Sequence, residues 1–233
     1  MTRMGLAVAG IGMAALLSAC GGDDFTDQSG QEIADASKAA MGKLDSVKVS
    51  GKITTGGQEV SIDVQTNDGG DCTGSIGVGD GTAELLGVDG TTWFKPDEAF
   101  WRASAGDNAD QIISVVGDKW VVVPASGDGF DQFCDIDDLL DELISSDKEA
   151  GEKYTAKDTE KVEGAEAVPV EHTSKDDGTS VGYVRVDDPH YLVKIEKTDG
   201  DDNGSVVFSE FDEKFDVEAP AEDDTIDLDN LQG

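Results

Sequence analysis

Two blocks of alternating polar and apolar residues, broken by turns rich in glycine and aspartate, constrain the fold of this chain most. In the first block the alternation covers 47–53 and 59–66, and residues 54–57 between them read Thr-Thr-Gly-Gly. Period-two alternation over short runs is typical of half-buried β-strands, and a short glycine turn joins two of them as a hairpin. Three more short strands are predicted within 72–95, where Gly-Asp-Gly and Asp-Gly mark the turns. Because no helical segment separates these strands, they are predicted to be sequential and antiparallel.

The second block occupies the last third of the chain. Its predicted strands are 167–174, 180–187, 191–198 and 205–211. The residues between the blocks change to helical spacing, with predicted helices at 96–104, 108–117 and 135–144 and a possible strand at 119–124. Another amphipathic helix is predicted over 32–46, before the first strand. The chain is therefore predicted to be an α+β protein in which a helical insert divides two meanders.

Capping residues support the helical segments of the insert. Asn108 and Gln111 have the spacing of a capping box, and Gly117 is placed to end that helix. Asp135 is the expected N-cap of the helix over 135–144, which is the clearest helix in the sequence.

The first nineteen residues have the parts of a secretory signal. Arg3 precedes an uncharged run of thirteen residues, and small residues follow it. Leu17-Ser18-Ala19-Cys20 resembles the bacterial lipobox, which implies that Cys20 is acylated and becomes the first residue of the mature protein. We therefore expect a removed signal (1–19), a lipidated tether (20–30), one domain (31–221) and an acidic tail (222–233), held at the extracytoplasmic face of the cell membrane by acyl chains such as palmitate. The alternative is an ordinary cleaved signal with a chance cysteine.

The formal net charge of −34 limits the partners of the chain. Nucleic-acid binding needs clustered lysine and arginine, so this class of partner is excluded. An anionic membrane surface would repel the domain, so attachment is expected through the lipid alone. Solubility of an exported protein is a sufficient reason for the acidity.

Two cysteines, Cys72 and Cys134, remain beside Cys20. An isolated pair outside the cytoplasm usually forms a disulfide, and no CxxC spacing indicates a redox-active pair. A bridge that closes roughly sixty residues is expected to contribute about 4 kcal/mol by chain-entropy models.

Motifs for catalysis and metal binding are weak. Asp199, Asp201, Asn203, Gly204 and Glu210 match the spacing of a calcium loop, but the flanking residues alternate as in strands, which favours a hairpin turn. The two histidines, His172 and His190, lie in no catalytic motif, and no phosphate-binding glycine loop is present. We expect neither an enzyme nor a cofactor.

Aromatic residues concentrate around the helical insert. Five of them fall within twenty-eight residues: Trp93, Phe94, Phe100, Trp101 and Trp120. They form either an ordinary core or, with the apolar faces of the inserted helices, the wall of an apolar cavity. The residues predicted to line such a cavity are Trp93, Phe94, Trp101, Ile112, Val116, Leu139, Leu140 and Leu143.

The order of elements resembles that of the actinobacterial lipoproteins of the LolA/LprG/LppX-like group. The local sequences that carry the resemblance are VKVSGKIT, GVDGTTWFK, DPHYLVKIE and VVFSEFDEKFDVEAP, and the resemblance covers roughly residues 31–221. It implies a half-open barrel, a curved antiparallel sheet whose concave face is covered by helices. In several members of the group a pocket between sheet and helices accepts acyl chains, and the group shares no catalytic residue.

The function implied by this resemblance is that of a surface lipoprotein that binds or carries a lipid or another hydrophobic ligand. The alternative is a non-carrier lipoprotein for surface interaction or sensing, whose core is filled by its own side chains. Cavity volume separates the two, since an acyl chain needs a continuous apolar space of ~300 Å³ or more.

Overall fold

The computed structural model describes residues 24–123, 131–144, 152–174, 178–197 and 203–227. Cys20 and the signal lie outside these residues, as do Asp199 and Asp201. In the described residues no helix is both long and apolar enough to cross a membrane.

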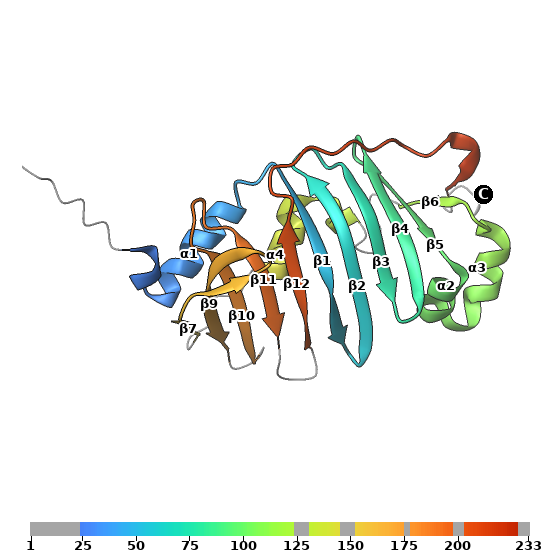
Figure 1. Ribbon diagram of the computed structural model, residues 1–233. Helices are drawn as coiled ribbons and strands as arrows, with labels where there is room; N and C mark the ends of the chain where they lie inside the picture. The colour runs from blue at the N-terminus through green and yellow to red at the C-terminus, as the bar shows by residue number, and fades with distance from the viewer. Residues whose placement is uncertain (1–23, 124–130, 145–151, 175–177, 198–202, 228–233) are drawn as a thin grey trace, which may run out of the picture.

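One large sheet organises the described residues (Figure 1). The first meander contains β1 (Ser46–Thr55), β2 (Gln58–Asn67), β3 (Cys72–Val78), β4 (Gly81–Val88) and β5 (Thr91–Pro96). The second contains β9 (Ala165–Thr173), β10 (Thr179–Arg185), β11 (Leu192–Lys197) and β12 (Asn203–Ser209). Strand β12 pairs antiparallel with β1, with Val49 opposite Phe208, so the two predicted meanders form a single continuous sheet.

Short strands complete the sheet at both ends, and the sequence predicted only one of them. At one end lie β7 (Lys153–Ala156) and β8 (Glu160–Val162), both paired with β9. At the other end β6 (Trp120–Val122) pairs with β5, and β13 (Thr225–Ile226) pairs with β6 in parallel. The sheet order is β13-β6-β5-β4-β3-β2-β1-β12-β11-β10-β9-β7, and every pairing except that of β13 is antiparallel.

The segment after β12 runs along one end of the strands to reach β6 (Figure 1). Near its start, Asp212 Oδ1 accepts a hydrogen bond from Asp45 N (2.9 Å). At its far end, Lys119 Nζ donates to Asp223 O (2.9 Å), next to the short helix η4 (Glu222–Asp224). The stretch predicted as a tail over 222–233 therefore begins with residues that pack on the sheet.

The principal helices are α1 (Gly30–Met41), α2 (Glu98–Ala105), α3 (Ala109–Val116) and α4 (Ile136–Ile144). The capping box of α1 is complete, because Ser29 N donates to Glu32 Oε2 (2.9 Å) and Glu32 N donates to Ser29 Oγ (3.3 Å). The Glu32 carboxylate also accepts a hydrogen bond from Ser29 Oγ (2.6 Å). This bond, followed by the one from Ser29 N, lowers the pKa of Glu32. Asp135 caps α4 as predicted, since its Oδ1 accepts from Asp137 N and Asp138 N at 3.0 Å each.

The capping box predicted for α3 does not form. Asn108 is in a helical conformation and makes no side-chain capping bond, because η2 (Gly106–Asn108) already leads into the helix. The predicted end of the helix is correct, since Gly117 follows α3 with a φ of 61°.

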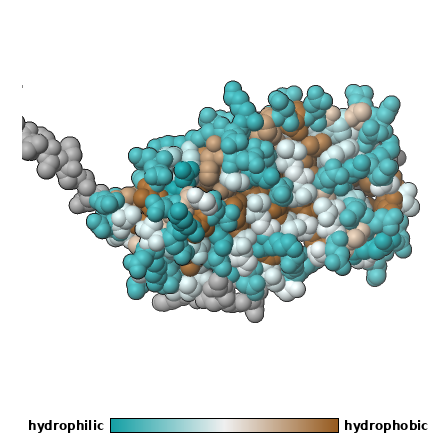
Figure 2. Space-filling view, in the orientation of Figure 1, coloured by the Kyte–Doolittle hydropathy of each residue, from teal (hydrophilic) through white to brown (hydrophobic). Residues whose placement is uncertain are grey.

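All four helices pack on the same face of the sheet, which we call the inner face. In most strands the residues that contact them have the same parity, for example Val47 and Val49 in β1, and alternate residues point away. In β11 a register shift in the pairing with β10 brings both Leu192 and Ile195 into these apolar contacts. In Figure 1 α4 passes behind the middle of the sheet, α1 lies at the end with β7 and β9, and α2 and α3 lie at the other end, next to β4 and β5. Figure 2 shows the opposite, outer face as a mixture of hydrophilic and hydrophobic residues.

Candidate functional site

Three apolar clusters follow one another along the inner face, and together we call them the apolar seam. The first lies under α1 and α4 and includes Leu139, Leu140 and Phe208. The second surrounds the cysteine pair on β3 and includes Val64 and Leu85. The third lies among α2, α3, β5 and β6 and is built from Trp101, Ala109, Val116 and Val121.

Shared residues join the three clusters into one apolar surface. Ile62 and Phe133 pack against both the first and the second cluster, and Phe94 packs against both the second and the third. All three are only half-buried, although they belong to the covered side of the sheet. The seam is therefore continuous, and the residues that link its clusters are only partly covered.

The predicted lining residues divide between the two ends of this seam. Trp101, Ile112 and Val116 lie in or against the third cluster, together with Phe94. Leu139, Leu140 and Leu143 lie in or against the first cluster, under α4. The structure thus does not bring the set into direct contact around one point, but it places these seven residues along one apolar surface.

Trp93 lies on the other face of the sheet, and this corrects the prediction that it shares a pocket with Phe94. Phe94 pairs with Leu85 and Val121, two residues of the seam. Trp93 pairs with Leu86 and Val122, which point away from the helices because successive side chains of a strand alternate. The indole of Trp93 therefore belongs to the outer face.

The predicted disulfide between Cys72 and Cys134 is present, and it attaches the start of α4 to β3. Thr66 Oγ1 adds a second link by donating to the carbonyl oxygen of Cys134 (3.0 Å). Thr66, Cys72 and Cys134 are all buried. These links fix the N-terminal end of α4 on the sheet, next to Phe133 and the central part of the seam.

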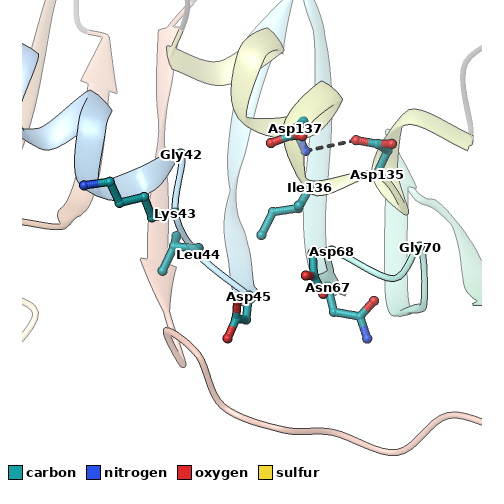
Figure 3. Close-up of a pocket in the computed structure, with 10 residues that line it drawn as sticks. All are labelled: Gly42, Lys43, Leu44, Asp45, Asn67, Asp68, Gly70, Asp135, Ile136 and Asp137. Atoms are coloured by element: carbon teal, nitrogen blue, oxygen red, sulfur yellow. Dashed lines mark hydrogen bonds between the residues drawn. The ribbon is translucent and has the colours of Figure 1, made fainter.

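A cavity of about 290 Å³ opens beside this attachment point (Figure 3). It is lined by the loop after α1, the end of β2 with its turn, and the first residues of α4: Gly42, Lys43, Leu44, Asp45, Asn67, Asp68, Gly70, Asp135, Ile136 and Asp137. Its four aspartates are exposed, whereas Leu44 and Ile136 are buried members of the first cluster. The cavity is a polar space that borders the apolar seam, and none of the eight predicted lining residues contributes to it.

The candidate calcium loop does not converge on one point. Asn203 opens β12 and Glu210 follows its last residue, so an extended strand of roughly 20 Å separates them. Ligands of one calcium ion lie within about 2.6 Å of it, so Asn203 and Glu210 cannot bind the same ion. Within the described part of the chain, no group of three or more histidine, cysteine, aspartate or glutamate side chains is placed to hold a metal ion.

Both histidines pack against aromatic rings. His172 stacks on Tyr154 with a ring separation of 4.6 Å, and its Nε2 lies 3.9 Å from Glu152 Oε2. His190 stacks on Phe25 at 3.7 Å. This packing supports structural roles for both side chains.

A group of charge interactions that shifts pKa values lies on β10 and β11, away from the seam. Lys194 Nζ donates to Glu196 Oε2 (2.8 Å), and this bond raises the pKa of Lys194 and lowers that of Glu196. The Lys194 ammonium also lies 5.4 Å from the ring centre of Tyr183, whose pKa is raised mainly by burial. This group stabilises the sheet and provides no reactive side chain to the seam.

Of the three residues that link the clusters, sequence reasoning found Phe94 and missed Ile62 and Phe133. Ile62 alternates with polar neighbours in β2, so its place on the covered face could have been read from the period of two. Phe133 had no such signal, because its position follows from the adjacent disulfide at Cys134.

Comparison with solved structures shows which proteins share this fold. LprF from Mycobacterium bovis aligns with 17% sequence identity and a TM-score of 0.57, over 82% of this chain and 97% of that one. LppX from Mycobacterium tuberculosis aligns with 14% identity and a TM-score of 0.46, over 81% and 98% of the two chains. A LolA superfamily protein from Nitrosomonas europaea aligns with 9% identity and a TM-score of 0.24, over 79% and 93%.

No protein-family model matches the sequence, and no curated protein matches it. At such low identities a likeness in structure shows the fold alone. Of these three alignments, the one with LprF has a TM-score high enough to support a shared fold. The chain is similar in structure to the mycobacterial lipoprotein LprF and shares its fold.

Proposed function

We propose that this protein is a lipid-anchored surface protein that binds a hydrophobic ligand along the apolar seam. The anchor is the acylated Cys20 expected from the lipobox resemblance. The ligand lies against the inner face of the sheet between α2 and α4, with the residues of the third and first clusters at its two ends. The fold shared with LprF supports this proposal, because the group that the sequence resembles includes carriers of acyl chains.

The observation that carries the proposal is the incomplete burial of the central seam. Phe94, Ile62 and Phe133 lie on the helix-covered face, yet water still reaches part of each side chain. Apolar surface left in water costs about 25 cal/mol per Å², so an apolar ligand that covers it gains free energy. An acyl chain there would contact apolar groups along its length.

A second candidate is a non-carrier lipoprotein with a filled core, and the two ends of the seam favour it. Leu139 and Leu140 are 2% and 4% exposed, and Val116 is 2% exposed. Water does not reach these side chains, so a ligand that contacts them must displace α4 or α3. Whether ligand is bound therefore separates the two candidates.

The test is native mass spectrometry of protein extracted from cells, followed by uptake of a fluorescent acylglycerol by the delipidated protein. A carrier shows co-purifying lipid and saturable uptake. Absence of both overturns the proposal in favour of the filled core.

Two matched substitutions locate the site. Ile62→Trp places a large side chain in the central seam and is expected to reduce uptake, whereas Val115→Trp adds the same side chain on α3, where Val115 is 50% exposed, and leaves uptake unchanged. Urea denaturation of both variants confirms that each is folded. Equal uptake by Ile62→Trp, Val115→Trp and the unmodified protein would place the ligand elsewhere.

The anchor has its own measurement. Cys20→Ser removes the acylated thiol, so metabolic labelling with an alkyne fatty acid is expected to disappear and the protein to leave the membrane fraction. Labelling that persists in Cys20→Ser would contradict acylation at this residue.

A further inference from the structure

One buried donor in the seam has no hydrogen-bond partner. Trp101 is 9% exposed, and among the described residues its indole Nε1–H makes no hydrogen bond. Buried polar groups in native proteins are almost always paired, so an unpaired one calls for a specific explanation. This donor lies within the apolar surface where the ligand is proposed to bind.

The indole of Trp101 packs against apolar side chains of the third cluster and against two phenylalanine rings. Phe94 meets the indole edge-to-face with a centroid separation of 5.6 Å, and Phe100 does so at 6.4 Å. Ala109, Val116 and Val121 complete the cluster. Because α2 fixes the ring in this position, the N–H is a preorganised donor.

The charges near Trp101 indicate what kind of acceptor fits. Arg102, the adjacent cation, points to the exposed side of α2 and pairs with Glu98 Oε2 (3.0 Å) and Asp110 Oδ1 (3.8 Å). A carboxylate or phosphate buried at Trp101 would therefore have no counter-ion, and a buried unpaired charge is strongly unfavourable. A neutral oxygen, such as an ester carbonyl, avoids this cost.

From these observations we infer that the ligand is a neutral acyl ester whose carbonyl oxygen accepts a hydrogen bond from Trp101 Nε1–H. The inference rests on the proposed function and narrows its ligand class. Free fatty acids and simple hydrocarbons are the weaker ligands, since the first bring an unpaired charge and the second leave the donor unsatisfied. Trp101 is thus a specificity residue within a surface that is otherwise apolar.

The experiment compares two probes with the same number of carbon atoms, methyl palmitate and heptadecane, by displacement of a fluorescent acylglycerol from the delipidated full-length mature protein. The unmodified protein is expected to bind the ester about tenfold more tightly, as one additional buried hydrogen bond implies. Trp101→Phe keeps an aromatic ring but removes the donor, so it is expected to lose this preference and retain its affinity for heptadecane. Trp93→Phe, the same change on the outer face, is the matched control and is expected to retain the preference.

Stability distinguishes recognition of the ester from a merely structural role. Trp101→Phe loses packing because the ring is smaller, but it also removes an unsatisfied buried donor, so only a small fall in the urea midpoint of the ligand-free protein is expected. A preference that survives in Trp101→Phe overturns the inference, as does equal binding of both probes by the unmodified protein, and in either case the proposed function stands. Failure to bind the acylglycerol or either probe removes the proposed function as well.

Discussion

Gly87 in β4 lies directly against Cys134, on the side where the disulfide crosses to β3. A Cβ atom at this glycine would be 2.8 Å from Cys134 Sγ and 3.0 Å from Cys72 Sγ, closer than side chains normally approach. The absence of a side chain at Gly87 therefore gives the disulfide the space that it occupies, and through it α4 is attached to the sheet.

Removal of the disulfide is expected to lower the free energy of unfolding by about 4 kcal/mol. The two cysteines are 62 residues apart, and a cross-link over that length restricts the unfolded chain by this amount in chain-entropy models. The measurement is urea denaturation of Cys72→Ala/Cys134→Ala. Reductant should lower the urea midpoint of the unmodified protein toward that of the double variant and leave the midpoint of the variant unchanged. A loss of unfolding free energy below about 1 kcal/mol would mean that the disulfide contributes little to stability.

Gly87→Ala is expected to destabilise the protein by about 1–3 kcal/mol, the usual cost of inserting a methyl group into a filled site. The reason is the contact with the disulfide, so the cost should shrink when Gly87→Ala is combined with Cys72→Ala/Cys134→Ala. Denaturation of all four proteins gives this coupling directly. Additive effects would show that the added methyl group meets some other part of the structure.

Asp97 holds α2 at two points, which predicts a graded response to substitution. Its Oδ1 accepts from Phe100 N (2.7 Å) as an N-cap, and its Oδ2 accepts from Thr82 N (3.2 Å) in β4. Asp97→Ala loses both bonds and is expected to lower the free energy of unfolding by about 1–2 kcal/mol. Asp97→Asn keeps one acceptor, so its stability should lie between that of Asp97→Ala and that of the unmodified protein. Urea midpoints test the order, and an Ala variant as stable as the parent would exclude a capping role.

Local patterns in the sequence were sufficient for most of the fold. The alternation of Val47, Val49 and Ile53 predicted a strand with its correct inner face, and the spacing from Ile136 to Ile144 predicted α4. The pair Cys72 and Cys134 could be assigned because the remaining cysteine, Cys20, lies in the sequence that resembles a lipobox. In each case the signal lies in the residues themselves and does not require knowledge of distant contacts.

Features that depend on distant contacts could not be predicted in this way. Strand β13 has only two residues, and it forms because Ile226 packs against the third cluster while Thr225 pairs with Trp120. The prediction that Trp93 lines a pocket with Phe94 is wrong for another reason. It groups five aromatic residues by their closeness in sequence, although neighbouring residues in a strand point to opposite faces. The same rule, applied within β5, would have separated Trp93 from Phe94.

Tyr191 and Asp212 provide a prediction at alkaline pH. Tyr191 Oη donates to Asp212 Oδ2 (2.7 Å), and burial, followed by this bond and the carboxylate charge, raises the pKa of Tyr191 to about 12 from the ordinary 10.0. A raised pKa means that folding favours the protonated phenol. Its contribution to stability is therefore complete below pH 10 and is lost as the pH rises through about 12.

We expect Asp212→Asn to lower the pKa of Tyr191, because the amide still accepts the hydrogen bond but no longer opposes the phenolate charge. Phenolate absorbance in a Tyr154→Phe/Tyr183→Phe background isolates this group, since the chain has three tyrosines. Tyr191→Phe in the same background should abolish the transition and so confirm its assignment. An unchanged transition in Asp212→Asn would mean that burial alone sets the pKa, and that Asp212 contributes mainly through the bond from Asp45 N that holds the chain after β12.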